Sequence, residues 1–310
     1  MLKRFFSCLT GVALIAGCGG GGGSSSPAGL PAAYTGKTTQ ATVTTANAKT
    51  LSMAAYNGSG WASAMGVVVL KAVASDSIIQ PPLIQDVVGI IESSAATIAQ
   101  QPKSSAKAVK SLTNTQNTVN GYSGSYSYNF NIDTVSGAVN GTETFSQYQA
   151  SSNSLTMSGT VTLSGVFNMV TSTFSSMNMT MTNLNITAGS SNITLSGNLA
   201  ASTSGSTTTE TFTFATTDNV THLTTLAYNY TMMLTGTSLT FAGTYYDPAE
   251  GYLTVSTVTP LTVASLSDTP TAGQLLFTGS NGTKARLTFS SVGTTVEADT
   301  AGNGTFVVVP

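Results

Sequence analysis

The sequence predicts a mainly β protein with a helical N-terminal segment, in which a large antiparallel meander of about 12–14 strands curls over apolar helices. Two observations predict the sheet. From residue 119 onward bulky side chains alternate with Ser, Thr and Asn, and turn signals such as Asn140-Gly141 and Asn281-Gly282 recur every 8 to 15 residues. A third observation, apolar residues at helical spacing within residues 46–110, predicts the helices.

Residues 1–17 have the three-part plan of a signal peptide. Lys3 and Arg4 form a basic start, and the apolar stretch that follows, of about a dozen residues, is too short to span a bilayer as a helix. The next tetrapeptide, Ile15-Ala16-Gly17-Cys18, resembles the lipobox of bacterial lipoprotein precursors. That resemblance implies cleavage before Cys18, a diacylglyceryl group on its thiol and a fatty acid such as palmitate on the new amine. The alternative is an ordinary secretory signal with an incidental cysteine.

Residues 18–45 are predicted to be the acylated cysteine and a flexible linker, because Gly, Ser, Thr, Ala and Pro dominate them and bury little apolar surface. Gly19 stands where many inner-membrane lipoproteins carry Asp. By resemblance to the enterobacterial sorting rule, it favours a lipid-anchored place at the outer membrane, on either its surface or its periplasmic side. The second cysteine, Cys8, lies in the signal peptide, so we expect a body without disulfides.

Residues 46–110 are predicted to be helical. Residues 46–56 would form a short helix that ends at Asn57-Gly58, and residues 61–79 are apolar nearly all round and suit either a helix or a strand. After Pro82 a second helix is predicted by an apolar stripe at helical spacing: Ile84, Val87, Val88, Ile91, Ala95 and Ile98. We expect a helical hairpin whose apolar surface is buried against the sheet.

Residues 119–310 are predicted to form the sheet. Aromatic residues alternate with Ser and Asn over residues 122–130, and Phe212 and Phe214 alternate with Thr. One strand changes phase: odd positions are apolar up to Met181, and even positions are apolar from Leu184. A shift of one residue reverses the faces of a strand, so we expect a bulge near Thr182-Asn183.

Several stretches of this region are similar to segments of uncharacterised Ser/Thr/Gly-rich β-sheet surface lipoproteins of proteobacteria. They are GTETFSQY, SGTVTLSGVFN and the C-terminal GQLLFTGSNGTKARLTF through VEADTAGNGTF. The similarity extends over about 190 residues. It implies a shared architecture and no particular activity.

Charge is sparse, since Asp, Glu, Lys and Arg make up only 7% of the chain, against about 25% in a typical domain. No Lys or Arg lies between Lys110 and Lys284, an interval that holds seven acidic residues. Such a body cannot neutralise phosphates, so we expect no nucleic acid among its partners.

Candidate catalytic residues are few. His222 is the single histidine and is expected on a strand, and no Gly-x-Ser-x-Gly elbow lies on a strand-to-helix turn. Asp247 and Glu250 are the nearest carboxylate pair that a glycosidase could use, but their surrounding Pro and Gly favour a turn. We therefore expect no enzyme activity and no catalytic residue.

No cofactor and no resident metal are expected. The nearest approach to a calcium site is Glu297, Asp299 and Asn303, in a segment similar to an Asp-x-Asp-x-Asp-Gly loop; Ala301 occupies its third ligand position. Met177, Met179 and Met181 would suit Cu(I), although methionines in such a stripe more often fill a core.

The sequence therefore favours a membrane-anchored, non-enzymatic surface lipoprotein with a structural or interaction role in adhesion or a matrix. One alternative is a periplasmic carrier of lipid or another hydrophobic ligand, held between sheet and helices. Another is a carbohydrate-binding surface protein. Its sugar-stacking face would consist of tyrosines: Tyr122, Tyr126, Tyr128, Tyr245, Tyr246 and Tyr252. Partners would be the membrane, through the anchor, and a protein, polysaccharide or lipid ligand.

Overall fold

The computed structural model describes residues 31, 33–56, 112–133, 135–152, 155–168, 173–189, 191–263 and 270–310. One helix, α1, covers Ala48–Tyr56, as the sequence predicts for residues 46–56. The signal peptide, Cys18, most of the expected linker and the predicted second helix lie outside the described residues.

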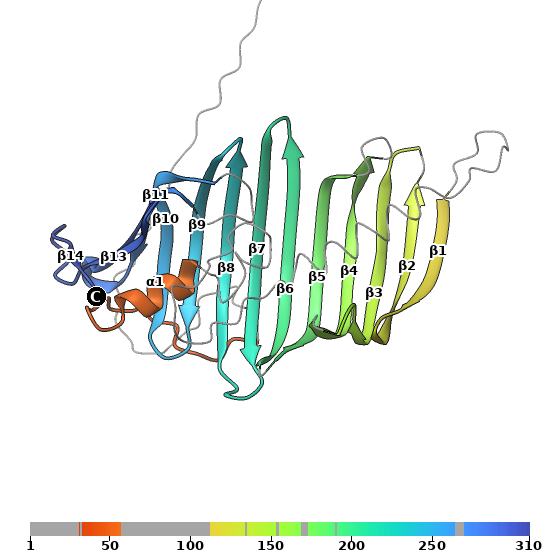
Figure 1. Cartoon of the computed structure of the whole chain (residues 1–310), viewed down its shortest axis with the longest axis horizontal. Coiled ribbons are helices and arrows are strands. Elements are labelled where there is room, and N and C mark those ends of the chain that lie inside the picture. Colours follow the sequence, from red (N-terminus) through yellow and green to blue (C-terminus); the bar gives the residue numbers. More distant parts are fainter. Residues whose placement is uncertain are drawn as a thin grey trace, which may run out of the picture.

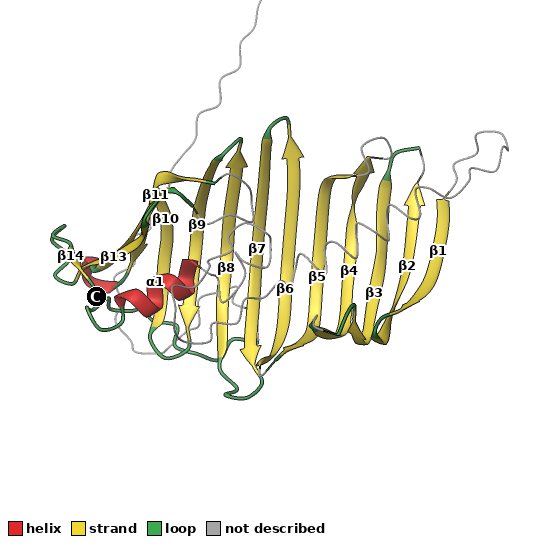
Figure 2. Cartoon of the chain, viewed as in Figure 1, coloured by secondary structure: helices red, strands yellow, loops and turns green. Residues whose placement is uncertain are grey.

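The prediction of a mainly β fold is confirmed: in the described residues, fourteen antiparallel strands form one sheet in which each strand pairs with the next in sequence (Figures 1 and 2). The first seven are β1 (Leu112–Asn120), β2 (Ser123–Asp133), β3 (Ala138–Gln149), β4 (Thr156–Asn168), β5 (Thr173–Ala188), β6 (Ser191–Ser204) and β7 (Thr207–Asp218). The others are β8 (Thr224–Thr235), β9 (Ser238–Asp247), β10 (Gly251–Thr262), β11 (Ala272–Thr278), β12 (Lys284–Ser290), β13 (Gly293–Asp299) and β14 (Val307–Val308), with a 3-10 turn at Ser280–Gly282.

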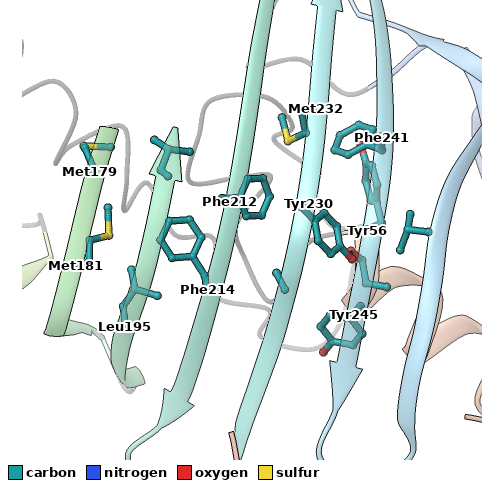
Figure 3. Close-up of a cluster of buried hydrophobic side chains, with 14 of the residues drawn as sticks. Tyr56, Met179, Met181, Leu195, Phe212, Phe214, Tyr230, Met232, Phe241 and Tyr245 are labelled. Carbon is teal, nitrogen blue, oxygen red and sulfur yellow. The ribbon is translucent and has the colours of Figure 1, made fainter. Parts of the chain in front are cut away.

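The sheet has an inner face, against which α1 packs, and an outer face on the opposite side. Because side chains alternate along each strand, cross-strand neighbours form rows that run across the sheet. One inner row is Tyr128, Glu143, Val161, Met181, Gly197, Phe214, Ala227, Tyr245 and Leu253. Nearly all of its members are apolar and buried, and they belong to one continuous core cluster. Figure 3 shows part of this cluster, with Phe212, Phe214 and Tyr230 projecting from neighbouring strands.

Glycines on the inner face make room for aromatic rings. The ring of Phe130 lies over Gly141 of the next strand, Phe214 lies over Gly197, and Tyr230 lies over Gly243. A large ring that covers a cross-strand glycine fills the space of the missing side chain. These glycines therefore have a packing role, since a Cβ would collide with the ring or with the backbone beneath it.

The predicted bulge is present. Asn183 has a φ of 49°, and the pairing of β5 with β6 shifts between Met181 and Leu184. The Asn183 N–H donates to Ser196 Oγ at 3.0 Å, and that hydroxyl donates to Asn183 Oδ1 at 3.1 Å. The extra residue returns Leu184 to the inner face, where it is fully buried. Related left-handed residues, Gln147 and Asn229, accompany register shifts in β3 and β8.

The expected alternation over residues 122–130 is correct only from Tyr126 onward. Tyr122 is 69% exposed and precedes β2, whereas Tyr126 and Tyr128 are buried on the inner face. Gly124 has a φ of 61°, and the pairing shifts between Ser123 and Ser125. Because of this irregularity, Tyr122 does not follow the alternation of inner-face and outer-face side chains along β2.

Residues 34–43 form a strap that passes from the outer face to the inner face, although the sequence predicts linker up to residue 45. Tyr34 packs on the outer face, whereas Ala41 and Val43 are fully buried in the inner cluster. Backbone hydrogen bonds fix the path: Tyr252 N–H donates to Thr39 O at 3.0 Å and Ser280 N–H donates to Ala41 O at 2.7 Å. Gly251 and Gly279 allow this close approach, because a Cβ at either would collide with the backbone of Thr39 or Ala41.

The strap leads directly into α1. Thr44 and Asn47 exchange side-chain-to-backbone hydrogen bonds before the helix, at 2.8 and 3.3 Å. Leu51, Ala55 and Tyr56 then pack into the inner cluster. Figure 1 shows α1 at the end of the sheet where the C-terminal strands turn around it, and its main contacts are with β9, β10, β12 and β13.

Candidate functional site

The outer face is the candidate interaction surface. Threonine pairs at alternate positions of β3, β4 and β5 lie in register, so that Thr142, Thr162 and Thr180 form one row. Thr144, Thr160 and Thr182 form the row beside it. Strands lie about 4.8 Å apart and alternate residues about 6.7 Å apart, so these hydroxyls form a regular grid. Four of the six residues are exposed, and the other two are partly exposed.

Amides and serine hydroxyls extend this grid toward both ends of the sheet. Asn114 Nδ2 donates to the side-chain oxygens of Asn129 and Asn131 at 2.9 Å, which links β1 to β2. Farther along, Asn192 Oδ1 accepts from Asn185 at 3.1 Å and from Asn219 at 2.6 Å. Neutral donors and acceptors therefore cover the outer face over most of its width.

From β3 to β8 the described outward side chains carry no charge, because the acidic residues of this region lie elsewhere. Glu143 and Glu210 project from the inner-face positions of β3 and β7. Asp133 and Asp218 end their strands, and each accepts two backbone N–H bonds of the following turn. Those bonds, from Thr221 and Val220, hold the pKa of Asp218 below its usual value.

Beside the hydroxyl grid, over β8 to β10, the outer face carries a tyrosine cluster: Tyr34, Tyr228, Tyr246 and Tyr252. Tyr246 lies at its centre, with ring centroids 5.4 Å from Tyr34, 6.3 Å from Tyr228 and 5.2 Å from Tyr252. Tyr34 and Tyr246 are buried, whereas Tyr228 and Tyr252 are partly exposed. Tyr228 and Tyr252, one on each side of the buried Tyr246, thus offer accessible rings.

The Tyr34 hydroxyl is held within the cluster by two carbonyl oxygens, of Lys37 and Asp247, each at 3.0 Å. Burial raises its pKa well above the usual tyrosine range, and the nearby Asp247 carboxylate raises it further. Burial also raises the pKa of Tyr246. These hydroxyls therefore stay neutral, and the outer face gains no charge from them at physiological pH.

Only part of the predicted sugar-stacking face comes together. Tyr246 and Tyr252 are neighbours on the outer face, but Tyr126, Tyr128 and Tyr245 are buried in the inner core. Sequence reasoning missed Tyr34, which lies in the expected linker, and Tyr228. The bulge at Asn229 places Tyr228 and Tyr230 on opposite faces, although residues two positions apart in a regular strand lie on the same face. An asparagine between two tyrosines was the available signal, because Asn tolerates the left-handed conformation.

The residues considered for catalysis lie in turns. His222, expected on a strand, is exposed in the turn between β7 and β8 with a φ of 58°. Asp247 Oδ1 accepts the N–H groups of Ala249 and Glu250, as the predicted turn requires. Glu250 Oε2 accepts a hydrogen bond from Asn47 Nδ2 at 3.1 Å. The Asp247 and Glu250 carboxylates are thereby used in local structure.

The residues nearest to a calcium loop are also engaged within the protein. Glu297 forms an ion pair with Arg286 at 2.8 Å. The Asp299 carboxylate accepts the N–H groups of Asn303 and Gly304; although burial opposes it, these bonds lower its pKa. Asn303 Oδ1 accepts from Thr305. Across the described part of the chain, no group of three or more His, Cys, Asp or Glu side chains could hold a metal.

The remaining predicted positions add no site to the described structure. Met177, Met179 and Met181 are buried in the inner core, where the last two project from β5 in Figure 3. Cys18 lies outside the described residues. No helix in the described ranges has the length and apolarity that crossing a membrane requires. Searches among protein-family models, curated proteins and solved structures each found no match.

Proposed function

We propose that the chain is a non-enzymatic surface lipoprotein, anchored to the outer membrane through Cys18, that acts in adhesion or a matrix through the outer face of its sheet. The observation that carries the proposal is that face itself: a regular, exposed grid of neutral hydroxyl and amide groups without charged side chains from β3 to β8. Such a face repels neither copies of itself nor uncharged polymers. The carboxylates of Asp133, Asp218 and Asp247 accept backbone N–H groups of the turns that follow them.

The alternative of a carrier for a hydrophobic ligand receives less support. Inner-face side chains such as Phe130, Met179, Phe214 and Leu253 are almost fully buried in this structure. A carrier would need apolar surface that its ligand can reach. If extracted protein contained stoichiometric lipid beyond its own acyl groups, this ranking would be reversed.

The anchor is tested separately from the interaction. Replacing Cys18 with Ser in the full chain should abolish incorporation of labelled palmitate and release the protein from membranes. Replacing Cys8 in the same way is the matched control and should change neither. Protease treatment of intact cells should then remove the body if it faces outward. Membrane retention of the Cys18→Ser protein would contradict the anchor.

The interaction is tested by placing charge on the grid. Thr144→Glu, Thr162→Glu and Thr180→Glu together should reduce the attachment of cells that display the full chain at least tenfold, because acidic groups would be desolvated at the contact. Val135→Glu with Val292→Glu is the control, since these side chains are 79% and 96% exposed in turns. Equal attachment by the two sets of variants, at equal surface amounts, would exclude the outer face as the contact.

A second candidate function, carbohydrate binding, is favoured by the tyrosine cluster. Partly exposed rings beside neutral hydroxyls suit the apolar faces and hydroxyl edges of sugars. Tyr228→Ala and Tyr252→Ala should each weaken retention on a neutral polysaccharide column, and Tyr122→Ala, an exposed tyrosine outside the cluster, should not. Unchanged retention of both cluster variants would remove this candidate.

A further inference from the structure

Among the described residues, the first strand, β1, forms a long edge of the sheet that pairs on one side only. β1 pairs with β2 over nine consecutive residues, from Leu112 opposite Asp133 to Asn120 opposite Ser125, without a register shift. No other strand pairs with β1 in the part of the chain that the structure describes. An edge of this length without a bulge presents a row of backbone N–H and C=O groups that can template a further strand.

The two edges of the sheet differ in how they are protected. Proteins usually block an edge with a short strand, a proline, a bulge or a charged side chain. The C-terminal edge uses two of these devices, since β14 has only two residues and Pro310 follows closely. β1, with the sequence LTNTQNTVN, has nine residues, no proline, no charge and no bulge.

The side chains of β1 are mostly polar on both faces. Asn117 and Val119 lie opposite the inner-face residues Tyr128 and Tyr126, yet Asn117 is exposed and Val119 is only partly buried. Asn114, Gln116 and Thr118 are exposed at the alternating positions. A strand that is polar on both sides is not tied to one core and is prone to alternative pairing. Val119 packs against the inner cluster, but the other described side chains of β1 are polar and exposed, so β1 forms a largely hydrophilic border.

We propose that two copies of the chain pair antiparallel through their β1 edges, about a two-fold axis at Gln116, so that one sheet continues through both. Antiparallel pairing about this axis places Asn114 opposite Thr118 of the second copy and Thr115 opposite Asn117. All of these residues are neutral, so no like charges meet, and the amide ladder of Asn114, Asn129 and Asn131 continues toward the new strand. Because the opposite edge is blocked, the pairing closes as a dimer and does not extend into a fibre.

A second copy is the occupant that this edge suits best. Self-pairing about a two-fold axis uses the same surface patch on both partners, and β1 is compatible with its own reversed sequence along its whole length. If the chain is anchored as proposed above, confinement to one membrane also raises the effective concentration of the partner. The dimer itself does not depend on the anchor.

The chain is well suited to a cysteine test, because Cys8 and Cys18 are its only cysteines. In the full chain with both replaced by Ser, Gln116→Cys should form a disulfide-linked dimer upon mild oxidation. Directly opposed residues of an antiparallel pair have Cα atoms about 4.5–5.5 Å apart, within disulfide reach. Two controls should stay monomeric on a non-reducing gel: Asn120→Cys, at the end of β1, and Thr162→Cys, exposed on the central strand β4.

A second measurement does not depend on cross-linking. The Cys-free chain should have twice the monomer mass by light scattering, and Gln116→Lys with Thr118→Lys should return it to the monomer by placing like charges across the axis. Thr254→Lys with Ser256→Lys adds the same charge at the same spacing, on exposed positions of β10 away from the threonine grid, and should leave the dimer intact. Circular dichroism confirms that each variant is folded.

Either of two outcomes overturns the proposal: a monomer at all concentrations up to about 100 µM, or a dimer that the β1 lysines do not affect. Because no lipid group is present in these proteins, failure here leaves the anchor and adhesion proposals standing. A negative outcome of the palmitate test or of the attachment test leaves the dimer proposal standing in the same way.

Discussion

The phenol of Tyr230 donates a hydrogen bond of 2.8 Å to the backbone carbonyl of Ala55. This contact joins the middle of β8 to the last turn of α1, where carbonyl groups have no partner within the helix. Both residues are buried, and Tyr56 beside them packs its ring 5.0 Å from Phe289 and 5.9 Å from Phe241. Burial raises the pKa of Tyr230 well above the usual range, so the donor remains protonated. The helix is thereby fixed to the sheet by a specific polar contact within an apolar core.

Tyr230→Phe should lower the free energy of unfolding by about 1–2 kcal/mol, because it leaves the Ala55 carbonyl buried without this donor while it preserves the ring. Urea unfolding followed by circular dichroism measures the change. Tyr228→Phe is the matched control, since its ring is partly exposed on the outer face, and it should change stability by less than about 0.5 kcal/mol. Equal losses in the two variants would show that the Tyr230 hydroxyl contributes nothing specific.

Much of the sheet could be predicted because its determinants are local. Alternation and turn residues belong to short windows of sequence, and the phase change around Asn183 is itself a local signal for a bulge. The strap could not be predicted. Its residues have no period, and its partners, including Asp247 and Thr283, lie more than 200 residues later in the chain. Tyr34 of the outer tyrosine cluster depends on the same long-range contact, and Tyr228 reaches the outer face through the bulge at Asn229, so sequence reasoning identified only Tyr246 and Tyr252 of the four rings.

Gly251→Ala should detach the strap from β10. Gly251 has a φ of 102°, and a Cβ there would collide with the backbone carbonyl of Thr39. The left-handed backbone alone costs about 1 kcal/mol for alanine, and the collision adds to it. Limited proteolysis should therefore cut the variant within residues 33–43 while the wild type resists.

Gly236→Ala is the control that separates the two effects of Gly251→Ala, the conformational cost and the collision. It has a φ of 59°, but no atom lies within 4 Å of the position its Cβ would take. Gly236→Ala should therefore be destabilised only by the cost of placing alanine in a left-handed conformation, and its strap should stay protected from proteolysis. Cleavage of the strap in both variants, or in neither, would contradict a steric role for Gly251.

The bulge at Asn183 predicts an order among substitutions. Asn183→Gly should be nearly neutral, because glycine adopts the left-handed backbone freely and keeps the N–H donor to Ser196. Asn183→Ala should cost about 1–2 kcal/mol, and Asn183→Val should cost more, because β-branched residues tolerate a positive φ least. Urea unfolding gives the order, and a glycine variant less stable than the alanine variant would be inconsistent with it.

Glu210 should make the protein less stable as the pH rises. It lies on β7 between Ala201 and Met232, and its Oε2 is buried without a hydrogen-bond partner among the described residues. Burial raises its pKa from 4.5 to about 7. The folded state therefore holds a proton that the unfolded state releases, so this contribution to stability is complete below pH 4.5 and is lost as the pH rises through 7.

Glu210→Gln removes that dependence. The variant should be more stable than the wild type by about 1–3 kcal/mol at pH 8 and should match it at pH 4, where both side chains are neutral.

Asp218→Asn is the opposite case. Hydrogen bonds from the turn lower the pKa of Asp218, so its contribution is present at neutral pH and is lost as the pH falls. Asp218→Asn should consequently destabilise the protein at pH 8 and lose that effect in acid. Urea midpoints at the two pH values test both signs. If Glu210→Gln had the same effect at pH 4 and pH 8, the buried carboxylate would not be the source of the pH dependence.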